Sequence, residues 1–126
     1  MRFLVLLCLT ALAGTALAEA SAGCDPDGDS KAFNRCRVCH ASAPGAADLS
    51  GPNLWNVVGR DAGTGSGYRY STAVVESGLT WNEQSLREYL ANPSLTIPGT
   101  RMASAPISDP DTLDAIICHL HTLKGD

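Results

Sequence analysis

The stretch Cys36-Arg37-Val38-Cys39-His40 does most to decide how this chain folds. Its pattern, Cys-x-x-Cys-His, is typical of covalent haem attachment, in which both thiols add to the vinyl groups of one porphyrin. Two intervening residues hold the sulfurs about one helical turn apart, so that both can reach the same porphyrin edge. The next residue, His40, can then place its imidazole beneath the iron as an axial ligand. The motif therefore predicts one covalently bound haem.

Three other interpretations of these cysteines remain open on the motif alone. A thioredoxin-like redox pair requires alternating strands and helices, and the sequence lacks that alternation. A zinc site could combine Cys36 and Cys39 with Cys118 and His121, which have suitable spacing. A plain structural disulfide would also fit. An export signal favours the haem interpretation, because attachment of this kind takes place after export.

Residues 1–18 have the three parts of a secretory signal peptide. Met1-Arg2 supplies a positive start, residues 3–12 are almost continuously apolar, and Ala16-Leu17-Ala18 has the small residues of a cleavage site. The apolar run is too short to span a bilayer comfortably, which argues against a membrane anchor. We expect cleavage after Ala18, a single domain over residues 19–126 and a periplasmic location.

Charge restricts the partners of this domain. The whole chain has nine basic and thirteen acidic side chains, for a formal net charge of −4, and removal of Arg2 with the signal brings it to −5. An acidic protein is a poor ligand for nucleic acid and for anionic lipid surfaces. Because no other apolar stretch could cross a bilayer, we expect neither a nucleic-acid partner nor stable membrane insertion.

Apolar periodicity and capping residues predict an all-α chain with long loops. We expect three main helices, over residues 28–40, 80–92 and 109–125, and a shorter one over residues 72–77. The second begins at a capping box, Thr80-Trp81-Asn82-Glu83, and the third at Asp109-Pro110. Residues 41–68 are rich in Gly, Ala, Ser and Pro and have few periodic apolar residues, which indicates loops that wrap around something.

Further motifs follow the first in a fixed order and cover nearly the whole domain. They are Ala32-Phe33-Asn34-Arg35 before the haem motif, Gly51-Pro52-Asn53-Leu54, Gly59-Arg60, Tyr68-Arg69-Tyr70-Ser71, Gly78-Leu79-Thr80-Trp81, Glu88-Tyr89-Leu90-x-Asn92-Pro93 and Ile97-Pro98-Gly99-Thr100-Arg101-Met102. In this order and spacing the chain resembles class I cytochrome c, in the branch shared by mitochondrial cytochrome c and bacterial cytochromes c2. The resemblance implies the cytochrome c fold, with its helices and long loops wrapped around one covalent haem c.

The resemblance also implies individual roles. Cys36 and Cys39 would attach the haem, His40 and Met102 would bind its iron, and Pro52 would orient His40 through its backbone carbonyl. Four residues would hydrogen-bond the haem propionates: Arg60, Tyr70, Trp81 and Thr100. Tyr89 would lie beside the distal ligand, Met102. Taken alone, Arg60 could be a solvated arginine and each aromatic residue ordinary core. Met102 also stands out by itself, because the other methionine is the initiator.

With both axial positions filled, the iron would carry single electrons rather than act on a substrate. We therefore expect a monomeric periplasmic electron carrier, not an enzyme. Its partners would be a membrane cytochrome complex, a dehydrogenase, an oxidase or a photochemical reaction centre. One alternative is a haem c subunit dedicated to one periplasmic oxidoreductase complex. Another is a ligand-binding or peroxidase-like haem protein, if Met102 dissociates easily.

The chain departs from the family pattern around the expected haem edge. Ser94 and Leu95 stand where mitochondrial relatives often carry lysines, so only a weak basic patch is expected, from Arg35, Arg37 and Arg101. Other departures lie at Val74, Ser104, Pro106 and His119. They put the rigidity of the Met102 loop in doubt without touching the expected ligands.

Cys24 and Cys118 lie outside the haem motif. In an oxidising periplasm two spare cysteines on one domain usually pair, and the family's first and last helices cross near Gly28, close to Cys24. Helical spacing opposes this pairing, because Cys118 lies nearly opposite the centre of the apolar stripe over residues 113–123. A lipid-modified start at Cys24 is a further alternative.

Overall fold

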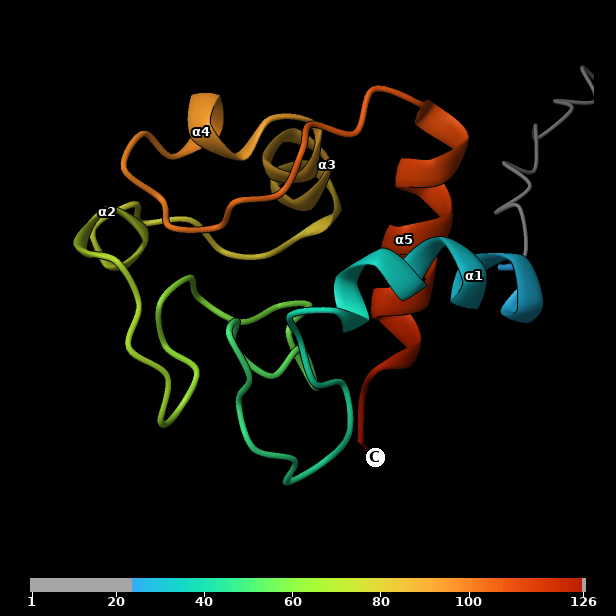
Figure 1. Ribbon diagram of the computed structural model, residues 1–126, viewed down its shortest axis with the longest axis horizontal. Coiled ribbons are helices and arrows are strands. Elements are labelled where there is room, and N and C mark those ends of the chain that lie inside the picture. Colours follow the sequence, from blue (N-terminus) through green and yellow to red (C-terminus); the bar gives the residue numbers. More distant parts are fainter. Residues whose placement is uncertain (1–23, 126) are drawn as a thin grey trace, which may run out of the picture.

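The computed structural model describes residues 24–125 and shows five helices joined by long loops (Figure 1). The predicted signal peptide over residues 1–18 lies outside the described residues. Within residues 24–125 the β-structure consists of one isolated bridge, between Asp61 and Thr80. The all-α prediction is therefore confirmed. No helix in the described range is long and apolar enough to cross a membrane.

The first and last helices cross on one side of the molecule (Figure 1). They are α1 (Pro26–Arg37) and α5 (Pro110–Thr122). Each begins at an aspartate whose carboxylate accepts a backbone N–H, and each has proline in its first turn, a position where the missing N–H costs nothing. Phe33 of α1 and Ile116 of α5 have no solvent exposure. This crossing therefore excludes solvent completely from one side chain of each helix.

The central helices lie on the other side, as α2 (Thr72–Val75), α3 (Glu83–Ala91) and α4 (Pro93–Thr96) (Figure 1). α4 was not expected. It forms because the Asn92 side chain accepts the N–H of Leu95, and because Pro93 suits the first position of a helix. The pair Asn92-Pro93 thus ends α3 and begins α4.

The predicted capping box is wrong by two residues. Asn82, not Thr80, caps α3, and it exchanges hydrogen bonds with Ser85 at 2.9 and 3.0 Å. The Thr80 hydroxyl instead donates to the Asp61 carboxylate at 2.7 Å, beside the bridge between these two residues. Thr80 is therefore held in extended backbone and cannot begin the helix.

The other helix ends differ from the prediction by a few residues. α1 begins two residues earlier than predicted and ends at Arg37, because the carbonyl of Cys36 accepts the N–H groups of both Cys39 and His40. That double acceptance tightens the chain into a turn. α2 is shorter than predicted. α5 ends at Thr122, after which the Leu123 carbonyl accepts the N–H of Asn56 at 2.7 Å.

A disulfide joins Cys24 to Cys118. Their Cα atoms are 5.6 Å apart, within the usual range for a disulfide. The sequence left this pairing open, and the structure shows that the two cysteines are bonded. The objection from helical spacing fails because Cys24 precedes α1 directly, and α1 crosses α5, so the chain reaches the face of α5 that carries Cys118.

We expect the variant with serine at both Cys24 and Cys118 to lose about 3 kcal/mol of unfolding free energy. The bridge joins residues 94 positions apart, so its removal frees most of the unfolded chain. Urea unfolding of the variant and of the wild-type protein measures the loss. Selective reduction of the wild-type disulfide should give the same loss, and unchanged stability in both experiments would contradict the prediction.

Candidate cofactor site

The haem motif lies where α1 ends, so the helix and the following turn position its three functional side chains. Cys36 is half-buried and Cys39 is exposed, and both carry free thiols. The His40 N–H donates to the Cys36 carbonyl at 2.9 Å, which places His40 directly after the two thiols on a tight turn. This arrangement leaves both sulfurs available for bonds to another molecule.

The alternative uses of these cysteines do not fit the structure. No disulfide joins Cys36 to Cys39, and Cys118, which the zinc alternative requires, is bonded to Cys24. Burial raises the pKa of the Cys36 thiol to about 11 in spite of the neighbouring arginines. A redox-active cysteine pair needs a lowered thiol pKa instead. The described residues also lack the strands of a thioredoxin-like fold.

The imidazole of His40 is held by a hydrogen bond to Pro52 and by close contact with the backbone of Gly51. Nδ1 lies 2.7 Å from the Pro52 carbonyl oxygen, so Nδ1–H donates and the lone pair remains on Nε2. This is the hydrogen-bonding pattern of a histidine that ligates a metal through Nε2. Gly51 packs against the ring, and a Cβ there would lie 2.7 Å from Nδ1 and 2.9 Å from Nε2. Only glycine fits at this position.

Met102 belongs to a second group of predicted residues that the structure brings together. Its N–H donates to Thr100 Oγ1 at 3.3 Å, and the same hydroxyl lies 2.6 Å from the Tyr89 hydroxyl. The rings of Tyr89 and Trp81 are both buried, with centroids 5.0 Å apart. Burial raises the pKa of the Tyr89 phenol, which keeps it neutral and able to donate. Half-buried Met102 is thus supported by a packed hydrogen-bonded segment.

Arg60 and Tyr70 form a third group and provide a positive charge. A Cβ on Gly65 would meet the Tyr70 hydroxyl and lie 3.4 Å from Arg60 Nη2, so both side chains converge on Gly65. Arg60 Nε is buried and lacks a hydrogen-bond partner among the described residues. A cavity of about 330 Å³ beside the guanidinium is lined by Pro52, Asn53 and Trp55 among others.

These features fit a haem. The guanidinium of half-buried Arg60 donates to the Trp55 and Asn53 carbonyls but keeps one buried, unsatisfied N–H at Nε. A haem propionate is a carboxylate that could accept this N–H. The two thiols, the Nε2 atom of His40 and the thioether of Met102 supply the remaining donors. Each group has the chemistry that a covalently attached, hexacoordinate haem requires.

Two residues of the sequence motifs, Gly51 and Asn53, have structural roles that the sequence did not predict. Gly51 sets the position of His40, and Asn53 organises the loop that contains it. The Asn53 amide donates to the carbonyls of Ala43 and Ala46 at 2.8 and 2.9 Å, and its side-chain oxygen accepts the N–H of Trp55. An asparagine in a glycine-rich loop suggests a side chain that bonds to the backbone. Its particular partners depend on the path of the loop, which the sequence does not give.

The chain is similar to several bacterial cytochromes c2. It is 45% identical over 92 residues to cytochrome c2 iso-2 from Magnetospirillum molischianum, covering 73% of this chain and 94% of the relative. It is 40% identical over 118 residues to cytochrome c2 from Rhodomicrobium vannielii, covering 91% of this chain and 94% of the relative. No protein-family model matches the chain.

A solved structure gives the same picture. Cytochrome cH from Methylobacterium extorquens matches with a TM-score of 0.73 and 42% sequence identity. The match covers 78% of this chain and 98% of that structure. Fold and sequence therefore agree over nearly the whole length of that structure.

We expect Gly51→Ala to displace His40 and to reduce the yield of haem-carrying protein severely. The added Cβ would overlap the imidazole and break its hydrogen bond to Pro52. Gly125→Ala is the control, because a Cβ there would make only an ordinary 3.9 Å contact with Trp55 and Gly125 does not have a positive φ. Haem content per folded protein measures the effect. Equal haem content in both variants would contradict this role of Gly51.

Proposed function

The chain belongs to the cytochrome c2 family of class I c-type cytochromes, and we propose that it carries one covalent haem c and shuttles single electrons in the periplasm. As a cytochrome c2-like protein it is an electron carrier and not an enzyme. The finer parts of the proposal are the ligands, the compartment and the redox partners.

We assign haem attachment to Cys36 and Cys39, and the two axial positions to His40 and Met102. The observation that carries this assignment is the 2.7 Å contact between His40 Nδ1 and the Pro52 carbonyl, because it leaves Nε2 free and aims the ring. Bound haem c supplies an iron that alternates between the ferric and ferrous states. The neutral imidazole and the soft thioether favour the ferrous state and raise the reduction potential.

The surrounding residues hold this arrangement and exclude water. The Thr100 hydroxyl accepts a hydrogen bond from the Met102 N–H and shares another with the Tyr89 hydroxyl, and so holds the thioether segment in place. Arg60 is the proposed partner of a propionate, with Tyr70 next to it. Trp81 and Tyr89 are buried and pack against each other beside Thr100. A rigid, dry site of this kind requires little rearrangement when an electron arrives.

We propose export and cleavage after Ala18, with a mature domain over residues 19–126. Two observations support this proposal besides the pattern of the first eighteen residues. Haem attachment to a Cys-x-x-Cys-His motif takes place after export, and the bond between Cys24 and Cys118 needs an oxidising compartment to persist.

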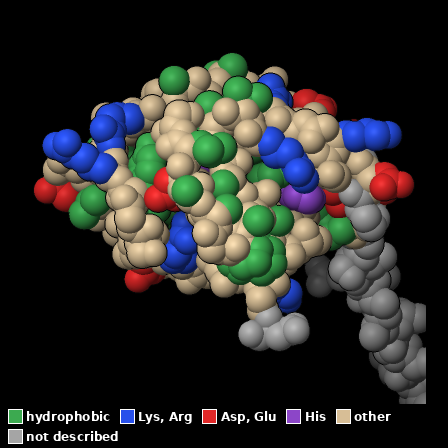
Figure 2. Space-filling view, turned by 60° about the horizontal axis from the view of Figure 1, so that its bottom comes forward, with side chains coloured by type: hydrophobic (Ala, Val, Ile, Leu, Met, Phe, Trp, Pro, Cys, Tyr) green, Lys and Arg blue, Asp and Glu red, His purple; other side chains and the backbone are tan. Residues whose placement is uncertain are grey.

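Partner recognition should depend little on positive charge. Arg35 and Arg37 are exposed next to the haem motif, but Leu95 and Val38, also close to expected contact positions, are exposed apolar side chains at 77% and 79%. The face in Figure 2 shows hydrophobic side chains near its middle, with basic and acidic side chains dispersed around them. We propose a membrane cytochrome complex, a dehydrogenase, an oxidase or a reaction centre as electron donor or acceptor.

Met102→Ala should remove the weak band that the oxidised protein shows near the red end of its optical spectrum. That band reports a bond between a methionine sulfur and ferric iron. The reduced variant should also bind carbon monoxide rapidly, because one axial position is then open. Ser104→Ala in the same loop is the control and should keep the band. A band that persists in Met102→Ala would refute the ligand assignment.

Electron transfer to a strongly acidic redox protein should slow only shallowly with salt, by less than about fivefold between low and physiological ionic strength. The weak basic patch provides little steering. Stopped-flow rates at several salt concentrations test this expectation. Leu95→Lys should steepen the salt dependence, whereas Leu95→Gln should not. A steep dependence in the wild-type protein would show that its basic patch is stronger than proposed.

A further inference from the structure

Asp29 is a buried carboxylate with no compensating partner in the described part of the chain. It is 7% exposed and is the one charged residue in the buried set of residues 24–125. Its Oδ2 atom accepts no hydrogen bond, and the ion pairs recorded there involve Arg87 alone. Burial of an unpaired carboxylate oxygen is costly, so its position needs an explanation.

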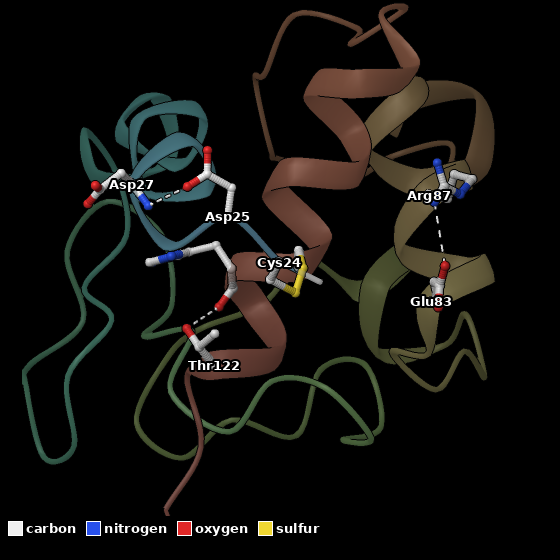
Figure 3. Close-up of a disulfide and its surroundings, with 8 residues drawn as sticks. Cys24, Asp25, Asp27, Glu83, Arg87 and Thr122 are labelled. Atoms are coloured by element: carbon white, nitrogen blue, oxygen red, sulfur yellow. Dashed lines mark hydrogen bonds and ion pairs between the residues drawn. A yellow bond between two sulfur atoms is a disulfide. The ribbon is translucent and has the colours of Figure 1, made fainter. Parts of the chain in front are cut away.

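The carboxylate lies against the disulfide. A carboxylate oxygen of Asp29 and the sulfurs of Cys24 and Cys118 are all within 4.8 Å of one another. Figure 3 shows Cys24 just before the start of α1, with its sulfur bonded to a residue of α5. Cys24 is exposed and Cys118 is half-buried, so small molecules in solution can reach the bond. The carboxyl group of Asp29 is therefore held next to an accessible disulfide.

Arg37, a cation at the other end of α1, faces another group. Arg37 Nη2 lies 3.5 Å from Nε2 of His119 on α5, and its guanidinium lies over the Phe33 ring. Burial and Arg37 lower the pKa of His119, with Asp29 opposing them, so His119 is neutral at pH 7 and cancels no charge. Asp25 and Asp27, labelled in Figure 3, add negative charge at the same end of α1. Three carboxyl groups, those of Asp25, Asp27 and Asp29, thus lie at the end of α1 that adjoins the disulfide.

A nearby carboxylate affects the rate at which thiols reduce this disulfide. An external thiolate attacks one sulfur of a disulfide, a new S–S bond forms, and the old bond breaks with its electron pair on the departing cysteine sulfur. A second external thiolate then releases the first cysteine. Two external thiols become one disulfide, and the two protein sulfurs take up two protons. Negative charge accumulates on sulfur in each attack, and a neighbouring carboxylate opposes it.

We propose that the negative charge of Asp29 protects the Cys24–Cys118 disulfide. It slows reduction of the disulfide by small thiols, and it slows reduction by anionic thiols most. Asp29 thereby keeps the disulfide between Cys24 and Cys118 of α5 intact in a compartment where thiols and disulfides exchange. It acts through charge alone and does not depend on haem ligation or on the electron-transfer role.

The test compares Asp29→Asn with wild type in the haem-carrying protein, after reduction of the iron with ascorbate. Disulfide reduction is followed by alkylation and intact mass. The reductants are mercaptoethanesulfonate, 2-mercaptoethanol and cysteamine, which are anionic, neutral and cationic in their side groups, at equal thiolate concentration. Asp29→Asn should accelerate reduction by the anionic thiol about tenfold, the neutral thiol less and the cationic thiol least.

Asp27→Asn is the matched control. Asp27 lies in the same first turn of α1 but is exposed, so its removal should change each rate by less than about twofold because solvent screens it. Equal acceleration by all three thiols would overturn the proposal, since a loosened structure speeds every reductant alike. Unchanged rates would also overturn it. Slower reduction would do so as well, because it would make Asp29 a proton carrier that assists exchange.

Discussion

The crossing of α1 over α5 is the contact on which the rest of the structure depends. Phe33 and Ile116 are both completely buried, and Cys36 lies one helical turn after Phe33. The crossing therefore sets the position from which the haem motif begins. At the end of α5 the Leu123 carbonyl accepts the N–H of Asn56, so the same helix pair also anchors the loop that follows His40. Cys24–Cys118 fastens the other end of the crossing.

Much of the chain beyond this crossing is loop, and its order comes from specific hydrogen bonds. The Asn53 side chain connects three backbone positions, the carbonyls of Ala43 and Ala46 and the N–H of Trp55, and its own N–H donates to the Asp48 carboxylate. Gly51 then brings the backbone against the imidazole of His40. A loop of this kind can place a histidine and an arginine accurately without a helix, provided that its polar groups are satisfied internally.

Two buried side-chain polar atoms in residues 24–125 have no hydrogen-bond partner, one in an acidic group and one in a basic group. Arg60 Nε lies beside the cavity near Pro52, where it fits an anionic group of the cofactor. Asp29 Oδ2 lies beside the disulfide. In a well-packed small domain such atoms are expensive, and each here marks a place where chemistry with another molecule is expected. We expect Arg60 to interact with a haem propionate and Asp29 to affect the reaction of the disulfide with thiols.

The sequence by itself determined the fold class, the haem motif and the order of the expected ligands, because these follow from residue type and spacing along the chain. It also placed α1, α3 and α5 to within a few residues, since caps and apolar periodicity are local. The tertiary structure alone decided what depends on distant partners. It made Asn82 the cap of α3 because Thr80 pairs with Asp61, and it joined Tyr89 to Thr100. It also settled the pairing of Cys24 and Cys118 and placed Asp29 beside them, because only the crossing of the first and last helices brings those residues together.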